Sequence, residues 1–296
     1  MSDAKILEEF EPQTDYFIGV DSDGCAIDQM NIKHFECFAP AYIQAFDLQA
    51  ISTLTRETAI YMNLFSIHRG INRWAGLDLL FDLLKQRPEV LESGVKLPEG
   101  KELHGFVTSG LPLSEAGIHQ WAAQHPSEEI ERCIKWGETV NELVAWMVKN
   151  CAPFHGVREA MEAMQGKVDA MVVSAASLQM LNHEWEEHDL KRYMSVIAGQ
   201  EMGTKSQQLA KAAVGKYHPD RILLLGDAPG DGQAAADNNA LWFPIRPGHE
   251  VESWQEFHDV GLPRFLEGTF RGDYQEQLIA DFNQLLPATP PWKTIN

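Results

Sequence analysis

The pattern of apolar and polar residues changes character along this chain. After Pro153, short apolar runs alternate with segments in which apolar residues recur every three or four positions. The runs predict strands at 170–174, 194–199, 222–226 and 241–245, and the segments between them predict helices at 157–164, 178–188, 206–214 and 233–238. Such alternation is typical of parallel strands joined by right-handed crossovers. We therefore expect an α/β fold in this part of the chain.

Residues 30–150 show helical periodicity throughout, most clearly at 53–68, 74–85 and 128–149. One apolar run, Tyr16–Val20, precedes this block and has no helix of its own nearby. The block is therefore predicted to be an insertion after the first strand. We expect a core domain of residues 1–24 and 152–296, with a helical C-terminal extension from about 250, and an α-helical domain of residues 25–151. An insertion at that point lies over the carboxyl ends of the sheet and can act as a cap.

The composition excludes several classes of partner. Of 296 residues, 43 are acidic and 24 basic, which gives a formal net charge of −19. This charge argues against a general nucleic-acid surface and against an electrostatic membrane anchor. No stretch approaches the roughly 20 apolar residues of a membrane span, and the start of the chain has no apolar signal-peptide core. We expect a soluble, cytoplasmic protein, and nothing in the sequence indicates its oligomeric state.

Acidic residues follow two of the predicted strands. Asp21 and Asp23 come directly after Tyr16–Val20, on a glycine turn, and Asp227 and Asp231 come after 222–226. A parallel sheet can bring these strand ends together. Taken alone, Asp-Ser-Asp-Gly can be an ordinary turn, and Asp231 can simply cap the next helix.

Two more residues lie between the acidic pairs in the sequence. Ser174 ends the predicted strand 170–174, and Lys205 stands at the head of the predicted helix 206–214. Each has a simpler interpretation, since Ser174 can be a strand-end or helix-capping hydroxyl and Lys205 can be a solvated lysine at a helix start. Ser177 also competes with Ser174 for the same site. The order and spacing of all the elements together favour a functional site.

In this order, the motifs resemble those of the haloacid dehalogenase-like hydrolase superfamily, most of whose members are magnesium-dependent phosphohydrolases. Asp21-Ser-Asp-Gly24 after a strand resembles the first motif, Ser174 the second, Lys205 the third, and Gly226-Asp-Ala-Pro-Gly-Asp231 the fourth. The resemblance covers residues of about 14–28 and 152–250. It implies a Rossmann-like parallel sheet flanked by helices, with a large helical cap inserted after the first motif.

The resemblance also implies a role for each residue. Asp21 would attack phosphorus and become an aspartyl phosphate, and Asp23 would act as general acid and then general base. Mg²⁺ would be held by Asp21, a backbone carbonyl at Asp23, Asp227 and Asp231. The remaining two residues, Ser174 and Lys205, would bind the non-bridging phosphoryl oxygens.

The helical block offers candidates for substrate recognition. Arg69 and Arg73 stand four apart in an acidic chain, on one face if the helix continues through Gly70. They can bind a carboxylate or second phosphate of the substrate, or they can lie on a solvated face or in salt bridges. Three aromatic residues at helical spacing are expected in the core of this block: Phe65, Trp74 and Phe81.

These features predict a magnesium-dependent phosphomonoesterase acting on a small phosphorylated metabolite through an aspartyl phosphate. A dehalogenase needs neither a metal nor an acid two residues after the nucleophile, so Asp23 with Asp227 argues against it. A phosphonatase needs a cap lysine; Lys33 is the one near the first motif, and the sequence gives no sign that it is buried. A phosphomutase would share the core residues. A catalytically silent small-molecule-binding protein is the alternative from another class.

Overall fold

The computed structural model describes residues 3–293, and the chain divides into two compact units. The first, which we call the sheet unit, contains the chain up to Asp28 together with Cys151–Leu285. The second, the helical unit, contains Gln29–Asn150 and the segment from Leu286 onward. Each unit has its own hydrophobic core.

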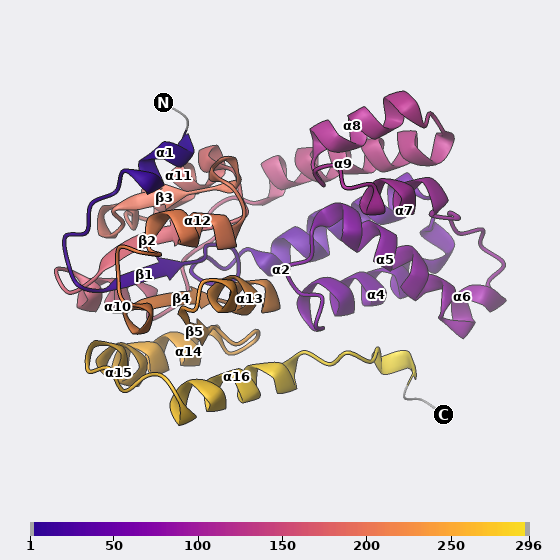
Figure 1. The fold of residues 1–296 in the computed structure, drawn as a ribbon. Helices are drawn as coiled ribbons and strands as arrows, with labels where there is room; N and C mark the ends of the chain where they lie inside the picture. The colour runs from indigo at the N-terminus through magenta and orange to yellow at the C-terminus, as the bar shows by residue number, and fades with distance from the viewer. Residues whose placement is uncertain (1–2, 294–296) are drawn as a thin grey trace. The chain divides into compact units, whose positions relative to one another are not determined.

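The sheet unit is built on five parallel strands in the order β3-β2-β1-β4-β5 (Figure 1). Their bounds are β1 Phe17–Val20, β2 Asp169–Val173, β3 Val196–Ala198, β4 Ile222–Gly226 and β5 Leu241–Pro244. Nearly every strand residue is buried, as expected of a parallel sheet covered on both faces. The predicted α/β fold is confirmed, and the predicted strand 222–226 coincides with β4.

Side-chain alternation assigns the strand residues to two faces. Ile18, Val172 and Leu223 point into a core that also contains residues of α10 and α11. On the other face, the ring of Phe17 lies 5.5 Å from that of Tyr217, which follows α12. Successive side chains of a strand point in opposite directions, so these short apolar strands are covered on both sides.

Helices of the sheet unit follow the predicted pattern. Their bounds are α1 Asp3–Glu8, α10 Val157–Met164, α11 Leu178–Glu187, α12 Lys205–Ala212, α13 Pro229–Asp237, α14 Glu250–Glu256, α15 Leu262–Leu266 and α16 Asp273–Leu285. The start of α12 is fixed by a capping box, because Thr204 accepts from the Gln207 amide and the Gln207 side chain accepts from the Thr204 amide. This cap places Lys205 in the first turn of α12.

The helical unit contains α2 to α9. Their bounds are α2 Met30–Ile32, α3 Ala39–Ala45, α4 Ser52–Leu64, α5 Arg73–Lys85, α6 Pro88–Glu92, α7 Lys101–Thr108, α8 Glu115–Gln124 and α9 Glu128–Met147. A π-helix, Lys33–Phe38, joins α2 to α3. In the core, Tyr42 and Trp136 are stacked with ring centroids 5.1 Å apart, and Trp74 meets Trp136 edge-on. Among residues 3–293, no helix has the length and apolar character needed to cross a membrane.

The boundaries between the units differ from the predicted ones at three places, one of which is Cys151, predicted in the helical domain but grouped with the sheet unit. Residues 25–28 group with the sheet unit, because Ile27 forms a bridge with Pro153 and the Asp28 amide bonds to the Ala152 carbonyl. The C-terminal segment from Leu286 groups with the helical unit instead of the core.

Contacts of the C-terminal segment explain its grouping. Its Trp292 ring packs edge-on against Tyr61 and lies 4.5 Å from the guanidinium carbon of Arg87, while the Tyr61 hydroxyl donates to the Pro287 carbonyl. These contacts join residues far apart in the sequence, which local periodicity cannot reveal.

The aromatic residues expected in the core of the helical unit divide into two groups. Trp74 and Phe81 are buried as predicted, but the prediction for Phe65 was wrong, since this side chain is exposed. The reason is that α4 ends at Leu64, before the predicted end at residue 68, so Phe65 no longer follows the helical spacing of the buried face.

Candidate active site

The register of the sheet brings the ends of three strands together. Val20 of β1 pairs with Val172 of β2 and with Leu225 of β4. Asp21, Ser174 and Asp227 follow these strands at the same edge of the sheet, at their carboxyl ends. This is the edge at which open α/β sheets bind ligands.

Three carboxylates converge at this edge. Each of Asp21, Asp227 and Asp231 offers an oxygen within 4.8 Å of the others, and all three side chains are buried. The Asp23 side chain does not belong to this cluster and is partly exposed. Carboxylate oxygens at this separation fit Mg²⁺, which prefers oxygen ligands and keeps several waters.

Lys205 connects two of the clustered carboxylates. Its Nζ lies 2.7 Å from Asp21 Oδ2 and 2.5 Å from Asp231 Oδ1. The two carboxylates raise the pKa of the lysine above its usual range although burial acts in the opposite direction. One lysine cannot balance three buried carboxylates, so the charge of the site as it stands suits a divalent cation.

Burial raises the pKa of the clustered acids, whereas it acts to lower the pKa of the lysine. Loss of solvent raises the pKa of Asp21 and of Asp231, while Lys205 lowers both, and the neighbouring carboxylates raise them further. Desolvation is the largest cause in each case, so the cluster favours proton uptake or a bound cation. Perturbed acids grouped at a strand edge are typical of functional sites.

Asp231 caps the helix that follows β4 and also belongs to the carboxylate cluster. One of its oxygens accepts from the Ala228 amide and so caps α13, and the other faces Lys205. Its carboxylate packs against Gly226, where a Cβ atom would overlap it. The glycine at the end of β4 is therefore required for steric reasons, not for an unusual backbone conformation.

Ser174 and Ser177 have different environments. The Ser174 hydroxyl is buried and accepts from the Ala176 amide, while Ser177 caps α11 by accepting from the Met180 amide. The capping role belongs to Ser177, and Ser174 stands at the strand edge. Gln208 of α12, which the sequence did not single out, donates to the carbonyls of Ser174, Gly199 and Gly203 and so joins three connecting segments.

The loop between Asp21 and Ile27 is held by its own backbone. The Ser22 carbonyl accepts from the amides of Cys25, Ala26 and Ile27, and the Ser22 amide donates to Asp21 Oδ1 at 2.8 Å. Two tryptophans from distant helices also bond to this loop, and no sequence pattern marked them.

Arg69 and Arg73 do not share a helix face, because α4 ends at Leu64 and Gly70 adopts a left-handed conformation with φ of 76°. The condition for a shared face, a helix that continues through Gly70, is therefore not met. Arg73 donates to Asn141 at 2.7 Å and lies over the Phe38 ring. Arg69 is buried and donates to the Leu64 carbonyl.

A second basic residue of the helical unit is also buried. Lys33, for which the sequence gave no sign of burial, is 7% exposed and opens the π-helix. The adjacent His34 has its pKa lowered to about 3 by burial and by the charges of Arg69 and Lys33. Its Nδ1 atom has no hydrogen-bond partner among the described residues. Three basic side chains therefore influence one another in the helical unit.

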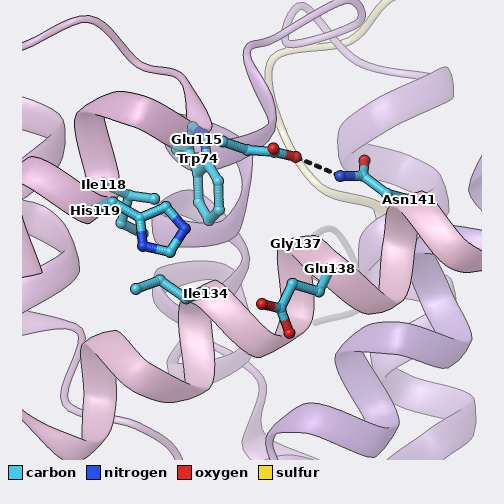
Figure 2. Close-up of a pocket in the computed structure, with 8 residues that line it drawn as sticks. All are labelled: Trp74, Glu115, Ile118, His119, Ile134, Gly137, Glu138 and Asn141. Atoms are coloured by element: carbon cyan, nitrogen blue, oxygen red, sulfur yellow. Dashed lines mark hydrogen bonds between the residues drawn. The ribbon is translucent and has the colours of Figure 1, made fainter.

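Figure 2 shows a pocket elsewhere in the helical unit, over the indole of Trp74. Its polar lining comes from Glu115, His119, Glu138 and Asn141, and Asn141 donates to Glu115. Two carboxylates in this lining repel anions. The pocket therefore suits a phosphorylated ligand less well than the strand edge with its lysine.

Comparison with known proteins gives matches only among solved structures. No family model matches the chain, and no curated protein matches it. Many matching structures are hydrolases of the haloacid dehalogenase superfamily. A putative phosphoglycolate phosphatase from Lactobacillus delbrueckii is 17% identical, with a TM-score of 0.48, covering 83% of this chain and 91% of its own.

Two further structures show the range of the matches. A subfamily IA hydrolase of this superfamily from Geobacter sulfurreducens is 16% identical, with a TM-score of 0.39, covering 77% of this chain and 86% of its own. A putative β-phosphoglucomutase from Thermotoga maritima is 14% identical, with a TM-score of 0.36, covering 81% and 99%. The matches include proteins named as phosphatase and as mutase, so no activity follows from the similarity.

Proposed function

We propose that this chain is a magnesium-dependent phosphomonoesterase that acts on a small phosphorylated metabolite through an aspartyl phosphate on Asp21. The observation that carries this proposal is the convergence of Asp21, Asp227 and Asp231 within 4.8 Å at one strand edge, with Lys205 bonded to Asp21 and Asp231. A carboxylate nucleophile needs a neighbouring cation before it can approach a phosphate dianion.

In the proposed reaction, a carboxylate oxygen of Asp21 attacks phosphorus, and the bond from phosphorus to the alcohol oxygen breaks. Asp23 gives its proton to the departing alkoxide and later takes one from the water that hydrolyses the aspartyl phosphate. The products are the alcohol and inorganic phosphate, and Asp21 and Asp23 return to their starting states.

Mg²⁺, when bound by Asp21, Asp227 and Asp231 with the backbone carbonyl of Asp23, supplies charge compensation for the phosphoryl group. Lys205 already lies against the Asp21 carboxylate, so it is placed to neutralise charge that develops beside the nucleophile. Ser174 offers its hydroxyl at the neighbouring strand end.

Recognition of the rest of the substrate is proposed for the helical unit. The basic side chains of this unit that influence one another are those of Lys33, His34 and Arg69. Such a group suits a second anionic group of the substrate, such as a carboxylate. Arg73 donates to Asn141 and lies over the Phe38 ring, and a smaller part in substrate binding is proposed for it. Replacement of Arg69 by Gln should raise the KM of substrates with two anionic groups more than the KM of substrates with one, and Arg73→Gln should have the smaller effect.

The test of the proposed function is phosphate release from a panel of sugar, nucleotide and small-acid phosphates, with Mg²⁺ or with a chelator. Asp21→Asn removes the nucleophile, and Asp28→Asn, at an exposed aspartate of the same segment, is the matched control. Release that requires both Mg²⁺ and Asp21, and survives Asp28→Asn, supports the proposal. Equal release from the Asp21→Asn variant contradicts it.

The burial of Lys33 favours a phosphonatase as the second candidate. Such an enzyme forms a Schiff base between a lysine amine and the substrate carbonyl, with loss of water. Borohydride would reduce that imine and leave a stable mass increase on Lys33 after incubation with an aldehyde phosphonate. No mass increase on Lys33, with phosphate released from esters, leaves the phosphomonoesterase as the assignment.

A further inference from the structure

Two buried tryptophans bond to the loop that carries the proposed nucleophile and proton donor. Trp185 of α11 donates from Nε1 to Ser22 Oγ at 2.9 Å, and Trp254 of α14 donates from Nε1 to the Cys25 carbonyl at 2.8 Å. Both indoles are fully buried, as are Ser22 and Cys25. These bonds join the loop to helices more than 150 residues away in the sequence.

The two contact points lie on either side of Asp23. Ser22 stands between Asp21 and Asp23, and Cys25 follows the Gly24 turn. The Ser22 carbonyl also receives the loop's own amide hydrogen bonds, so movement of Ser22 would disturb the whole loop. An indole N–H can only donate, and both acceptors lie in a dry environment where each bond is well defined.

We propose that Trp185 and Trp254 are positioning residues that fix the loop of Asp21 and Asp23 in its reactive geometry. The inference rests on the proposed function, because it concerns the same two aspartates. Misplacement of reacting groups by about 1 Å can lower a rate about 100-fold. Loss of either indole N–H should therefore lower kcat, while substrate binding by other groups keeps KM nearly unchanged.

The chain offers a matched control for the loss of indole volume. Trp242 of β5 is also buried in the sheet unit, but its Nε1 has no hydrogen-bond partner among the described residues. A change from Trp to Phe therefore removes volume at all three sites and removes a hydrogen bond only at Trp185 and Trp254. The comparison separates packing from positioning.

The first experiment measures kcat and KM of Trp185→Phe, Trp254→Phe and Trp242→Phe with the best substrate of the phosphate-ester panel. We expect a fall in kcat of about 10-fold to 100-fold for the first two, KM within about threefold of the parent, and near-parental kcat for Trp242→Phe. Melting temperatures should fall in all three, and further in Trp185→Phe and Trp254→Phe, which also lose a buried hydrogen bond. Equal kcat for Trp185→Phe and Trp242→Phe would overturn the inference.

A second variant tests the hydrogen bond between Trp185 and Ser22 at its acceptor. It keeps the inference testable if the Trp-to-Phe variants do not fold. Ser22→Ala removes the acceptor of Trp185 without creating a large cavity. If the two side chains act through one bond, Trp185→Phe combined with Ser22→Ala should be no slower than the slower single variant. Losses that multiply would contradict the proposed link.

An activity-independent measurement distinguishes failure of this inference from failure of the proposed function. Amide hydrogen exchange at Cys25, Ala26 and Ile27 should be at least about 10-fold faster in Trp185→Phe than in Trp242→Phe, because these amides bond to Ser22. Faster exchange in a chain that releases no phosphate would keep the structural role and remove the enzymatic one. Unchanged exchange with normal kcat would remove the positioning role alone.

Discussion

Replacement of Lys205 by Met gives the sharpest test of the carboxylate cluster. The lysine lies 2.7 Å from Asp21 and 2.5 Å from Asp231, and its side chain is only 18% exposed. Met fills a similar volume but carries no charge, so the variant leaves Asp21 and Asp231 without the ammonium group that lies against both. The perturbation is electrostatic, with little change in packing.

The expected magnitude follows from the burial of both partners. Removal of one member of a buried ion pair destabilises a protein by about 3–5 kcal/mol, because the remaining charge is uncompensated. The partial exposure of Lys205 and proton uptake by the carboxylates reduce this figure, so we expect a loss of about 3 kcal/mol in the free energy of unfolding. Replacement of Asp231 by Asn in the same chain removes one of the opposing charges and should restore at least about 1 kcal/mol.

Urea unfolding followed by circular dichroism, in the presence of a chelator, measures these differences. Lys211→Met is the matched control, since Lys211 lies on the same helix and its Nζ is 3.6 Å from a Glu8 carboxylate oxygen in a pair that is half-exposed at the lysine and exposed at the glutamate. The free energy of unfolding of Lys211→Met should stay within about 0.5 kcal/mol of the parent value. Excess Mg²⁺ should narrow the difference between Lys205→Met and the parent, because a cation bound to the folded cluster replaces the missing charge. A loss below about 1 kcal/mol for Lys205→Met would refute the reasoning.

Three further predictions concern stability. Gly226→Ala should lower the free energy of unfolding by about 3 kcal/mol, because the new Cβ overlaps the Asp231 carboxylate. Gly230→Ala is the control, since no atom lies within 4 Å of a Cβ at that position. Equal urea unfolding midpoints for the two variants would contradict this prediction. Asp169→Ala should cost about 3 kcal/mol in the same assay, since its Oδ2 accepts from two amides and two hydroxyls, and Asp169→Asn should cost less. The pKa of His34 falls from 6.5 to about 3 on folding, so the unfolded chain binds more protons than the folded chain between these values. The free energy of unfolding should therefore decrease by about 2 kcal/mol between pH 7 and pH 5. The variant His34→Gln should lose this pH dependence, and the same dependence of stability on pH in the variant would refute the role of His34.

The periodicity of apolar residues predicted the strands and helices that depend on local sequence. The run Ile222–Gly226 is apolar at nearly every position and bounded by polar residues, so the strand was predicted with its correct ends. The order of strands and helices implied a parallel sheet, which can bring the ends of two strands together, and the pairing of β1 with β4 places Asp21 and Asp227 after neighbouring strands. Topology alone therefore accounts for much of the candidate site.

Features that depend on side chains meeting across the fold were not predictable. Nothing near Trp185 in the sequence indicates a hydrogen bond to Ser22, and nothing near Trp292 indicates a contact with Arg87. The burial of Lys33 was not predicted either, because no local pattern in the sequence marked this side chain as buried. Arg69 and Arg73 do not share a helix face, because α4 ends at Leu64 and Gly70 has a positive φ, and neither feature follows from the four-residue spacing.

The acidic cluster opposes folding, and its surroundings show how the fold accommodates it. Burial of carboxylates is unfavourable unless each finds a donor or a cation. Asp231 has the Ala228 amide and Lys205, and Asp21 has Lys205 and the Ser22 amide. These partners leave the cluster with excess negative charge. A site that served stability alone would gain from apolar residues at these positions, so the presence of carboxylates at a strand edge, with perturbed pKa values, favours a functional reason for the arrangement.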